Sequence, residues 1–591
     1  MDEIKPAPES TINQHENATN SSEEHIALKN DTFEIHDSAL GNDLPKGYYY
    51  NWRFIGVVIG SVISNNVYIM PYILSANAMP IIEADLGSSK NSVWVALAYT
   101  LCTAVCLLLF GRLTDIFGRR YFVIGAHTFG LVGCIIAGTA NRIDTIVGGM
   151  VFAGLAARVQ KCWVVFLAEL IPKKHRPITV ATIYFTSIPG YGLTPAIVRS
   201  LLVSTGNNWR WCFYICIILD ASLVVIFTLC YFPSQFQQLH VHRSRWEQIK
   251  RIDFVGVFLF TAGLLLFLMG LSWGGGVYPW KSASVIATIV VGFCVLVAFI
   301  TWEWFYKGDQ ILPLHLFKAP GFVPMTICAS IGTCVAYSAA IIWPAEVNGL
   351  LPGSPETHGF LTSVQTSCTL IGMGVSGVFI RFLPYHKQFL IFSCLILTSF
   401  TGALASVQPG ETAKACSLMA FAGMGIGLFE SASRSLLPLS CPDEDIGAAI
   451  GVLGTVGYAS AAVATAIYVT VLNTKVTAIV PGKVIEAALQ AGLPKKDLIK
   501  LLELFSTNIT AVPDITPEIA QAVGIAAQNG TADAFRYVWY TAVAFGLVAT
   551  IASCFVISYT EYYTDTVARK MRVDQAQRDA SALEHDTSEK V

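Results

Sequence analysis

The stretch GRLTDIFGRR, residues 111–120, places four charged residues and two glycines between two runs that contain no Asp, Glu, Lys or Arg. The preceding run is VWVALAYTLCTAVCLLLF (93–110), and the following run is YFVIGAHTFGLVGCIIAG (121–138). A helix that crosses a bilayer needs about 20 mainly apolar residues. The pattern therefore predicts two membrane helices joined by a short charged loop.

The composition of the whole chain agrees with a membrane protein. Of its 591 residues 54% are hydrophobic and 13% are charged, whereas a soluble domain carries roughly 25% charge. The net charge of −2 and the lack of a basic stripe argue against a nucleic-acid partner. The 15 cysteines form no CxxC pair, so we expect small apolar side chains and no metal. No GxxxxGK[ST] loop occurs, and we expect no cofactor and no enzyme activity.

The apolar runs predict an all-α membrane protein with fourteen spans. They do not alternate in polarity, as the strands of a barrel would. The predicted spans are 54–80, 92–110, 121–140, 146–170, 178–202, 209–231, 254–272, 283–305, 322–344, 358–381, 389–407, 412–437, 446–472 and 534–559.

Lysine and arginine in the short loops predict the orientation, because cytoplasmic loops are enriched in them. With the N-terminus inside, thirteen such residues fall in inner loops, among them Arg112, Arg119 and Arg120, against four in outer loops. Both termini are therefore expected in the cytoplasm, with the polar residues 1–50 as a disordered tail and 561–591 as a second tail.

One predicted outer loop is long. Residues 473–533 contain the sequons that begin at Asn508 and Asn529, which are candidate glycosylation sites. VIEAALQ (484–490) and KDLIKLLELF (496–505) suggest short amphipathic helices lying over the outer face. A plain spacer is the alternative interpretation.

The loop at 111–120 contains more than an orientation signal requires. Gly111 and Gly118 permit tight turns at either end. Asp115 lies among three arginines, Arg112, Arg119 and Arg120, and can pair with them or cap a helix. This arrangement predicts a breakable latch. The pattern Gly-x-x-x-Asp-x-x-Gly-Arg-Arg resembles the loop between spans 2 and 3 of the major facilitator superfamily, where it helps to lock the outward-open state.

Further segments narrow the resemblance. The chain is similar to the fungal trichothecene efflux pump family, fourteen-span relatives of drug:proton antiporters. The matching segments are AELIP (168–172), WRWCFYICIILD (209–220), RSRWEQIKRIDFVG (243–256), FLMGLSWGGGVYPWKSASVIATIVVGF (267–293) and VIEAALQAGLP (484–494).

This resemblance implies a 6+2+6 layout of the major facilitator fold. It places one six-helix bundle in 51–232, a two-helix insert in 233–320 and a second bundle in 321–560. GVFIRFLPYHK (377–387) looks like a decayed second copy of the loop at 111–120. Paired halves of this kind bind substrate at their interface.

Ionisable residues inside spans are candidates for proton coupling, because they are costly in a membrane. Asp220 lies midway along its span, either as a proton carrier or as a structural carboxyl that burial keeps neutral or that pairs with a polar neighbour. Glu430 and Arg434 are spaced i, i+4 and are expected to neutralise each other. Arg158 requires an anionic partner or a water-filled cavity, and it stands where the resembled superfamily has a glycine.

The span at 178–202 contains IPGYGLTP, with Pro189, Gly190, Gly192 and Pro195. Antiporter relatives carry a glycine–proline motif in this span, and the spacing here matches it in part. A helix that bends is one interpretation, and tight packing against a neighbour is the other.

Aromatic residues inside spans could line a cavity for a bulky apolar compound. We expect Tyr99, Tyr184 and Tyr337 to line it. The functional hypothesis is a monomeric, proton-coupled exporter of a hydrophobic metabolite, mycotoxin or drug, in the plasma membrane or else the vacuolar membrane. The alternatives are a proton-coupled siderophore–iron importer of the same fold and a non-transporting sensor.

Overall fold

The computed structural model describes eleven stretches of the chain, together with scattered positions in 92–106, 163–171 and 497–501. The stretches are 50–87, 119–161, 175–206, 208–232, 253–274, 278–306, 314–319, 321–383, 385–437, 446–494 and 516–557.

These stretches are almost entirely helical, apart from an isolated bridge between Gly274 and Tyr278. The main helices are α2 (Trp52–Val67), α3 (Met70–Leu86), α5 (Arg119–Gly138), α6 (Ile143–Lys161), α8 (Arg176–Thr186), α9 (Thr194–Ser204), α10 (Arg210–Cys230), α13 (Phe254–Trp273), α14 (Ala283–Phe305), α15 (Phe322–Leu350), α16 (Pro355–Phe382), α17 (His386–Ala403), α18 (Thr412–Leu436), α19 (Ile446–Gln490) and α21 (Pro517–Cys554).

Twelve helical segments of the described chain are long and apolar enough to cross a membrane, so the predicted all-α membrane fold is confirmed. Two predicted spans look different. The span at 92–110 falls largely outside the described residues. The span at 178–202 consists of α8, a five-residue π-helix at Ile188–Gly192, and α9.

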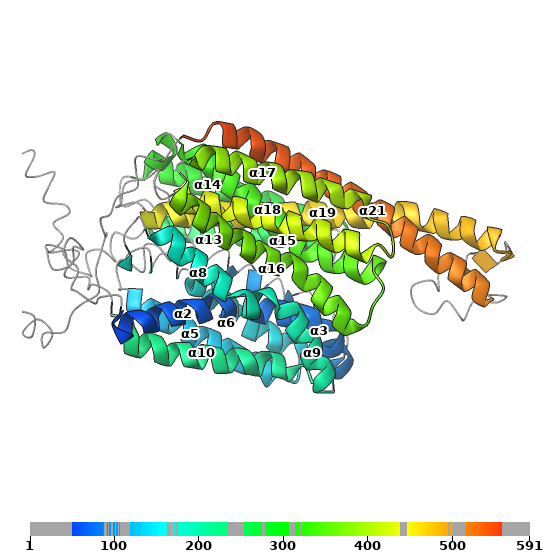
Figure 1. Ribbon diagram of the computed structural model, residues 1–591, viewed down its shortest axis with the longest axis horizontal. Coiled ribbons are helices and arrows are strands. Elements are labelled where there is room, and N and C mark those ends of the chain that lie inside the picture. Colours follow the sequence, from blue (N-terminus) through cyan, green and yellow to red (C-terminus); the bar gives the residue numbers. More distant parts are fainter. Residues whose placement is uncertain are drawn as a thin grey trace, which may run out of the picture.

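Figure 1 shows two groups of helices lying side by side. Helices α2, α3, α5, α6, α8, α9 and α10, which we call the N-terminal bundle, form one group. Helices α15 to α21, the C-terminal bundle, form the other. The pair α13 and α14 packs on itself and against α19.

The two bundles meet along α16, which packs against both α8 and α9. Near the π-helix, Thr366 Oγ1 donates to the Gly192 carbonyl at 2.7 Å. One turn further along, Ser363 Oγ accepts from the Ala196 amide at 3.1 Å. Irregular backbone in one bundle is thus satisfied by hydroxyls of the other.

Glycines allow helices within each bundle to approach closely. At the crossing of α5 and α6, a Cβ on Gly133 would lie 2.6 Å from the Gly149 carbonyl oxygen. At the crossing of α16 and α18, a Cβ on Gly427 would lie 2.0 Å from the Thr369 carbonyl oxygen. In lipid the hydrophobic effect does not drive helices together, and small residues stabilise their association by allowing close van der Waals contact.

The expectation of short helices lying over the outer face is wrong for residues 484–490. These residues form the end of α19, which is 45 residues long and continues without interruption. At 1.5 Å per residue it spans about 68 Å, roughly twice the hydrocarbon thickness. Figure 1 shows the end of α19 projecting together with the start of α21.

The projecting hairpin is held together by an apolar cluster of its own. The cluster contains Val480, Val484, Ala488, Leu493, Leu501, Ile519 and Val523. The apolar face of 484–490 is therefore covered by α21, which explains why the segment extends as a helix. Most of 496–505 lies outside the described residues.

Candidate functional site

The first span is interrupted near its middle, and the residues at the interruption form part of the candidate site. Helix α2 ends at Val67 and α3 begins at Met70, with a proline in its first turn. The Tyr99 hydroxyl donates to the carbonyl of Tyr68, which the break has freed. Asn65, just before the break, accepts from the Trp163 indole and donates to Ser187, each at 3.0 Å.

The π-helix at Ile188–Gly192 lies opposite this break. Pro189 and Pro195 have no amide hydrogen, so the regular hydrogen-bond ladder cannot continue through them. Asn66 Oδ1 accepts from the Tyr191 amide at 2.6 Å. A Cβ on Gly190 would lie 2.3 Å from the same oxygen, so this contact requires a glycine. The structure thus places the predicted helix-bending residues at an irregular turn that contacts the first span.

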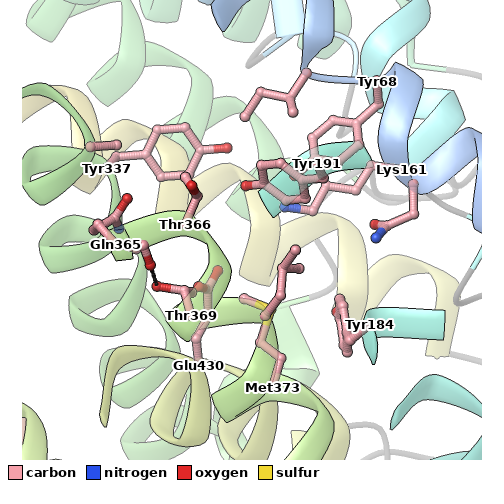
Figure 2. A pocket seen from close by; sticks show the side chains of 15 residues that line it. Tyr68, Lys161, Tyr184, Tyr191, Tyr337, Gln365, Thr366, Thr369, Met373 and Glu430 are labelled. Carbon is pink, nitrogen blue, oxygen red and sulfur yellow. Dashed lines mark hydrogen bonds between the residues drawn. The ribbon is translucent and has the colours of Figure 1, made fainter. Parts of the chain in front are cut away.

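A cavity lies between the two bundles, next to both irregular turns. Figure 2 shows phenolic rings from both bundles converging on it, together with Lys161 and Glu430. The residues that line it are Asn65, Tyr68, Ile69, Lys161, Tyr184, Tyr191, Ala336, Tyr337, Ala340, Gln365, Thr366, Thr369, Leu370, Met373 and Glu430. The wall therefore combines nine apolar or phenolic side chains with six polar or charged ones.

Two of the three tyrosines expected in the lining lie in this wall, Tyr184 and Tyr337. The third, Tyr99, does not line the cavity. It is buried behind the wall, where it stacks on Tyr72 with ring centroids 5.5 Å apart and bonds to the Tyr68 carbonyl. The break in the first span turns Tyr68, rather than Tyr99, toward the cavity.

Charged groups from both bundles meet at one side of the cavity. Glu430 Oε1 and Arg434 Nη2 form an ion pair of 2.6 Å, as their spacing predicted. Arg434 also donates to Thr333 Oγ1 at 3.1 Å. Arg158 lies with its guanidinium 4.2 Å from the ring centre of Tyr458, so it has an aromatic partner.

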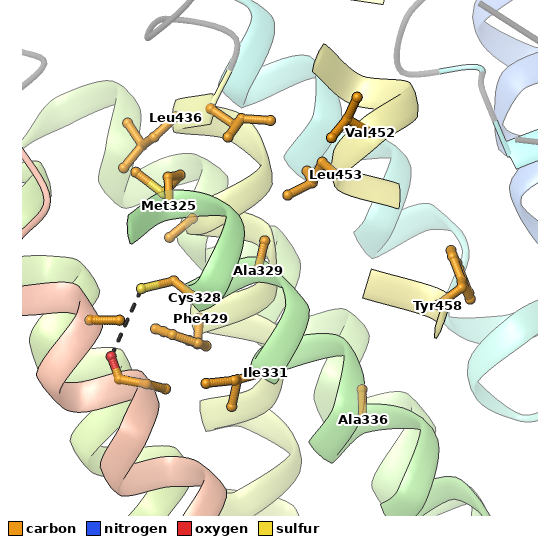
Figure 3. Close-up of a cluster of buried hydrophobic side chains, with 14 of the residues drawn as sticks. Met325, Cys328, Ala329, Ile331, Ala336, Phe429, Leu436, Val452, Leu453 and Tyr458 are labelled. Carbon is orange, nitrogen blue, oxygen red and sulfur yellow. Dashed lines mark hydrogen bonds between the residues drawn. The ribbon is translucent and has the colours of Figure 1, made fainter. Parts of the chain in front are cut away.

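Tyr458 connects the two bundles. Its hydroxyl accepts from Lys161 Nζ of α6 at 3.2 Å and from the Tyr337 hydroxyl of α15 at 3.1 Å. Figure 3 shows Tyr458 at the edge of the apolar cluster of the C-terminal bundle, away from Met325 and Phe429. The residue thus belongs to the packed core on one side and to the polar side of the cavity on the other.

The N-terminal bundle holds a second polar group, within its own interior. His127 and Asp220 are almost completely buried, at 0% and 1% exposure. His127 Nδ1 lies 2.9 Å from Asp220 Oδ1, and Gln160 Nε2 donates to the same oxygen at 2.9 Å. Asp220 Oδ2 has no hydrogen-bond partner in the described part of the chain.

The hydrogen bonds around Ser64 indicate where the protons lie. Ser64 has one hydroxyl proton, and the Gln160 carbonyl at 2.8 Å can only accept it. Ser64 Oγ is then the acceptor in its 3.3 Å contact with His127 Nε2. His127 Nε2 is thus placed as a donor, and His127 Nδ1 and Asp220 Oδ1, 2.9 Å apart, share one further proton between them. Loss of one proton would leave a net negative charge in this core.

Four residues of these two groups were missed by the sequence prediction: His127, Gln160, Lys161 and Tyr458. His127 and Lys161 are ionisable residues within apolar helices, so the criterion that selected Asp220 applies to them as well. Gln160 and Tyr458 gave no such signal, because their roles depend on which helices become neighbours.

The predicted gating loop is described only at its end. Gly111, Arg112, Asp115 and Gly118 lie outside the described residues. Arg119 and Arg120 begin α5, and Arg120 Nη2 donates to the Thr228 carbonyl at 2.7 Å while its guanidinium lies 3.9 Å from the Phe232 ring centre. The end of the loop is therefore attached to the last turn of α10.

Of the two sequons, the structure describes only the one that begins at Asn529. Asn508 lies outside the described residues. Asn529 is exposed on α21, in the projecting hairpin. Its glycosylation stays a prediction.

Alanine at Gly130 is expected to disturb the buried pair, because a Cβ there would lie 2.7 Å from Gln160 Nε2 and 2.9 Å from Asp220 Oδ2. The two side chains must shift, and one hydrogen bond is weakened. The sequence predicts proton-coupled transport, and on that prediction we expect Gly130→Ala to lower the transport rate about threefold to tenfold. Gly125→Ala on the same helix is the matched control, because a Cβ at this position would meet no atom within 4 Å. Equal transport by both variants, measured in reconstituted vesicles, would contradict the expectation.

Comparison with known proteins adds independent information. The family model for the fungal trichothecene efflux pump (TRI12) matches residues 28–590. The chain is 30% identical over 542 residues to the trichothecene efflux pump TRI12 of Fusarium sporotrichioides, covering 90% of each chain. It is 28% identical over 552 residues to the pump of the same name from Trichoderma arundinaceum, covering 90% of this chain and 91% of that one.

A solved structure of the major facilitator superfamily, the proton:xylose symporter XylE, is similar in fold. The TM-score is 0.51 at 12% identity, and the match covers 84% of this chain and 94% of that one.

Proposed function

The chain belongs to the fungal trichothecene efflux pump family of the major facilitator superfamily, and we propose that it exports a bulky, largely apolar metabolite in exchange for protons. It is a multi-pass membrane transporter and not an enzyme. The observation that carries the proposal is the cavity between the bundles, walled mainly by apolar and phenolic side chains. Such a cavity suits a compact, hydrophobic compound with a few polar groups.

The buried pair of His127 and Asp220 is the proposed proton carrier. It exchanges one proton between two states that differ in net charge, in a core where charge is costly. Glu430, Arg434 and Arg158 are less suited to this role. The first two compensate each other in an ion pair, and the guanidinium of Arg158 does not release its proton.

Two pairs of consecutive residues, one in α2 and one in α6, connect the proton carrier with the cavity. Ser64 contacts His127, and the next residue in α2, Asn65, lines the cavity. Gln160 contacts Asp220, and the next residue in α6, Lys161, also lines the cavity. A change of charge at the buried pair therefore acts on two helices that form the cavity wall.

The loop at 111–120 remains the proposed cytoplasmic gate, with Asp115 as its breakable contact. The proposed layout keeps bundles at 51–232 and 321–560, with 233–320 between them. The protein is proposed to act as a monomer in the plasma membrane with both termini in the cytoplasm. This orientation rests on the distribution of lysine and arginine in the loops.

The relatives' names favour export over the siderophore–iron uptake that the sequence left open. Membership of a transporter family likewise gives no support to a non-transporting sensor.

Cellular content of a labelled trichothecene and a labelled ferric siderophore tests the direction. Fungal cells with and without the chain are compared, each with and without a protonophore. Export predicts a lower trichothecene content that rises when the proton gradient collapses. A higher siderophore–iron content that falls on collapse would contradict export.

A further inference from the structure

Lys161 is the one cavity-lining cation among the described residues, and its surroundings are aromatic rather than acidic. Its Nζ donates to the Tyr458 hydroxyl at 3.2 Å and lies 4.9 Å from the ring centre of Tyr68. None of the described carboxylates forms an ion pair with it.

The charges around Lys161 do not balance. Arg158, Arg434 and Glu430 lie close enough to interact electrostatically with it. Glu430 is already bound to Arg434 at 2.6 Å. Lys161 and Arg434 therefore face one described carboxylate, and that carboxylate is already bound to Arg434.

An ammonium group inside a protein is costly unless an anion or several acceptors replace its water. The neighbouring acceptors are phenols, which supply only part of that replacement. A ligand that brings a negative charge to Nζ would therefore add an ion pair, which none of the described side chains forms with Lys161.

A cationic ligand is less favoured at the charged side of the cavity. Aromatic rings bind cations over their faces. Here Lys161 already lies over Tyr68, and Arg158 over Tyr458. The protein's own cations thus already lie over two of the aromatic rings near Lys161.

We propose that the transported compounds include organic anions, apolar metabolites that carry one carboxylate or enolate, and that Lys161 binds this anionic group. The proposal rests on the transport function proposed above and specifies its substrate class. The remainder of the compound lies against Tyr184, Tyr191, Leu370 and Met373, which line the same cavity.

The anion also acts on the contact between the bundles. Lys161 belongs to α6 and Tyr458 to α19, so their hydrogen bond joins the two halves. An anion at Nζ competes with the Tyr458 hydroxyl for the same donor. Substrate binding thus weakens one link between the bundles at the place where they must separate.

The test is competition binding to the purified full-length protein in detergent. Tritiated gibberellic acid, a rigid terpenoid with one carboxylate, is the probe, and its unlabelled methyl ester is the neutral competitor. The acid is expected to bind at least about tenfold more tightly than the ester, the value of one charge-assisted hydrogen bond. Lys161→Met should remove this preference, whereas Lys161→Arg should keep it.

Lys475→Met is the matched control. Lys475 lies 4.0 Å from the ring centre of Tyr537 of α21, so the same substitution removes a similar cation–aromatic contact further along α19. We expect wild-type affinity for the acid. Thermal unfolding of each variant checks that the fold is retained.

Equal affinity for acid and ester, no binding of either, or an acid preference that survives Lys161→Met would overturn the proposal. The trichothecene accumulation experiment separates this outcome from failure of the transport function. A chain that lowers trichothecene content but shows no acid preference is an exporter without the proposed anion site. A chain that lowers no labelled metabolite refutes both.

Discussion

Asp220→Asn is expected to abolish proton-driven transport while leaving the protein folded and able to exchange substrate. Asparagine keeps the size of the side chain and can still accept from Gln160 Nε2, which now lies 2.9 Å from Asp220 Oδ1. It cannot ionise, so His127 loses its carboxylate partner and the pair can no longer switch between a neutral and a negative state. We expect gradient-driven transport to fall about tenfold or more.

Counterflow separates this expectation from simple misfolding. Exchange of labelled for unlabelled substrate across vesicles without a pH gradient requires the conformational change but no net proton movement. Asp220→Asn should retain counterflow and lose gradient-driven accumulation. Loss of both, or of neither, would show that Asp220 is a structural residue.

Asp85→Asn is the matched control for this substitution. Asp85 likewise accepts from a nitrogen donor, the indole Nε1 of Trp209 at 2.9 Å, but its side chain is 49% exposed. The Trp209 hydrogen bond and the Arg210 guanidinium hold the pKa of Asp85 below its usual range. It stays ionised at neutral pH, so it exchanges no proton there. We expect wild-type transport from this variant.

Gly427→Ala is expected to give the largest loss of stability. Its Cβ would lie 2.0 Å from the Thr369 carbonyl oxygen and 2.7 Å from the Met373 amide nitrogen. Both are backbone atoms, so α16 and α18 must move apart rather than repack a side chain. Overpacking of this kind costs about 1–3 kcal/mol, and the backbone contact places it at the upper end.

The measurement is the thermal unfolding midpoint of the purified protein, together with its elution as a single species. Gly524→Ala in α21 is the control, because a Cβ at this position would meet no atom within 4 Å. We expect a clear fall in the midpoint for Gly427→Ala and little change for the control. Similar midpoints for the two variants would mean that the α16–α18 crossing adapts without cost.

The sequence predicted the helical fold because a long apolar run in a bilayer must satisfy its backbone hydrogen bonds internally, and an α-helix does so. It also identified Asp220 and the Glu430–Arg434 pair, since charged residues stand out against apolar runs. The extension of α19 was not predicted, because no membrane limits the length of a helix that continues into water beside a partner helix.

The cavity wall was predicted only in part for a related reason. Which tyrosine faces the cavity depends on the break at Tyr68, which redirects the first span and leaves Tyr99 behind it. Lys161 and Tyr458 are 297 positions apart in the sequence, and only the packing of the bundles brings them together. Contacts between residues so far apart cannot be predicted from the hydropathy or spacing of neighbouring residues.

The most direct test of proton-coupled export uses the full-length protein in liposomes with a labelled trichothecene outside and a pH gradient across the membrane. Antiport predicts accumulation inside when the lumen is acidic, and none when the gradient is reversed or dissipated. Protein-free liposomes correct for passive partitioning. Accumulation only with an alkaline lumen, or accumulation that ignores the gradient, would contradict the account.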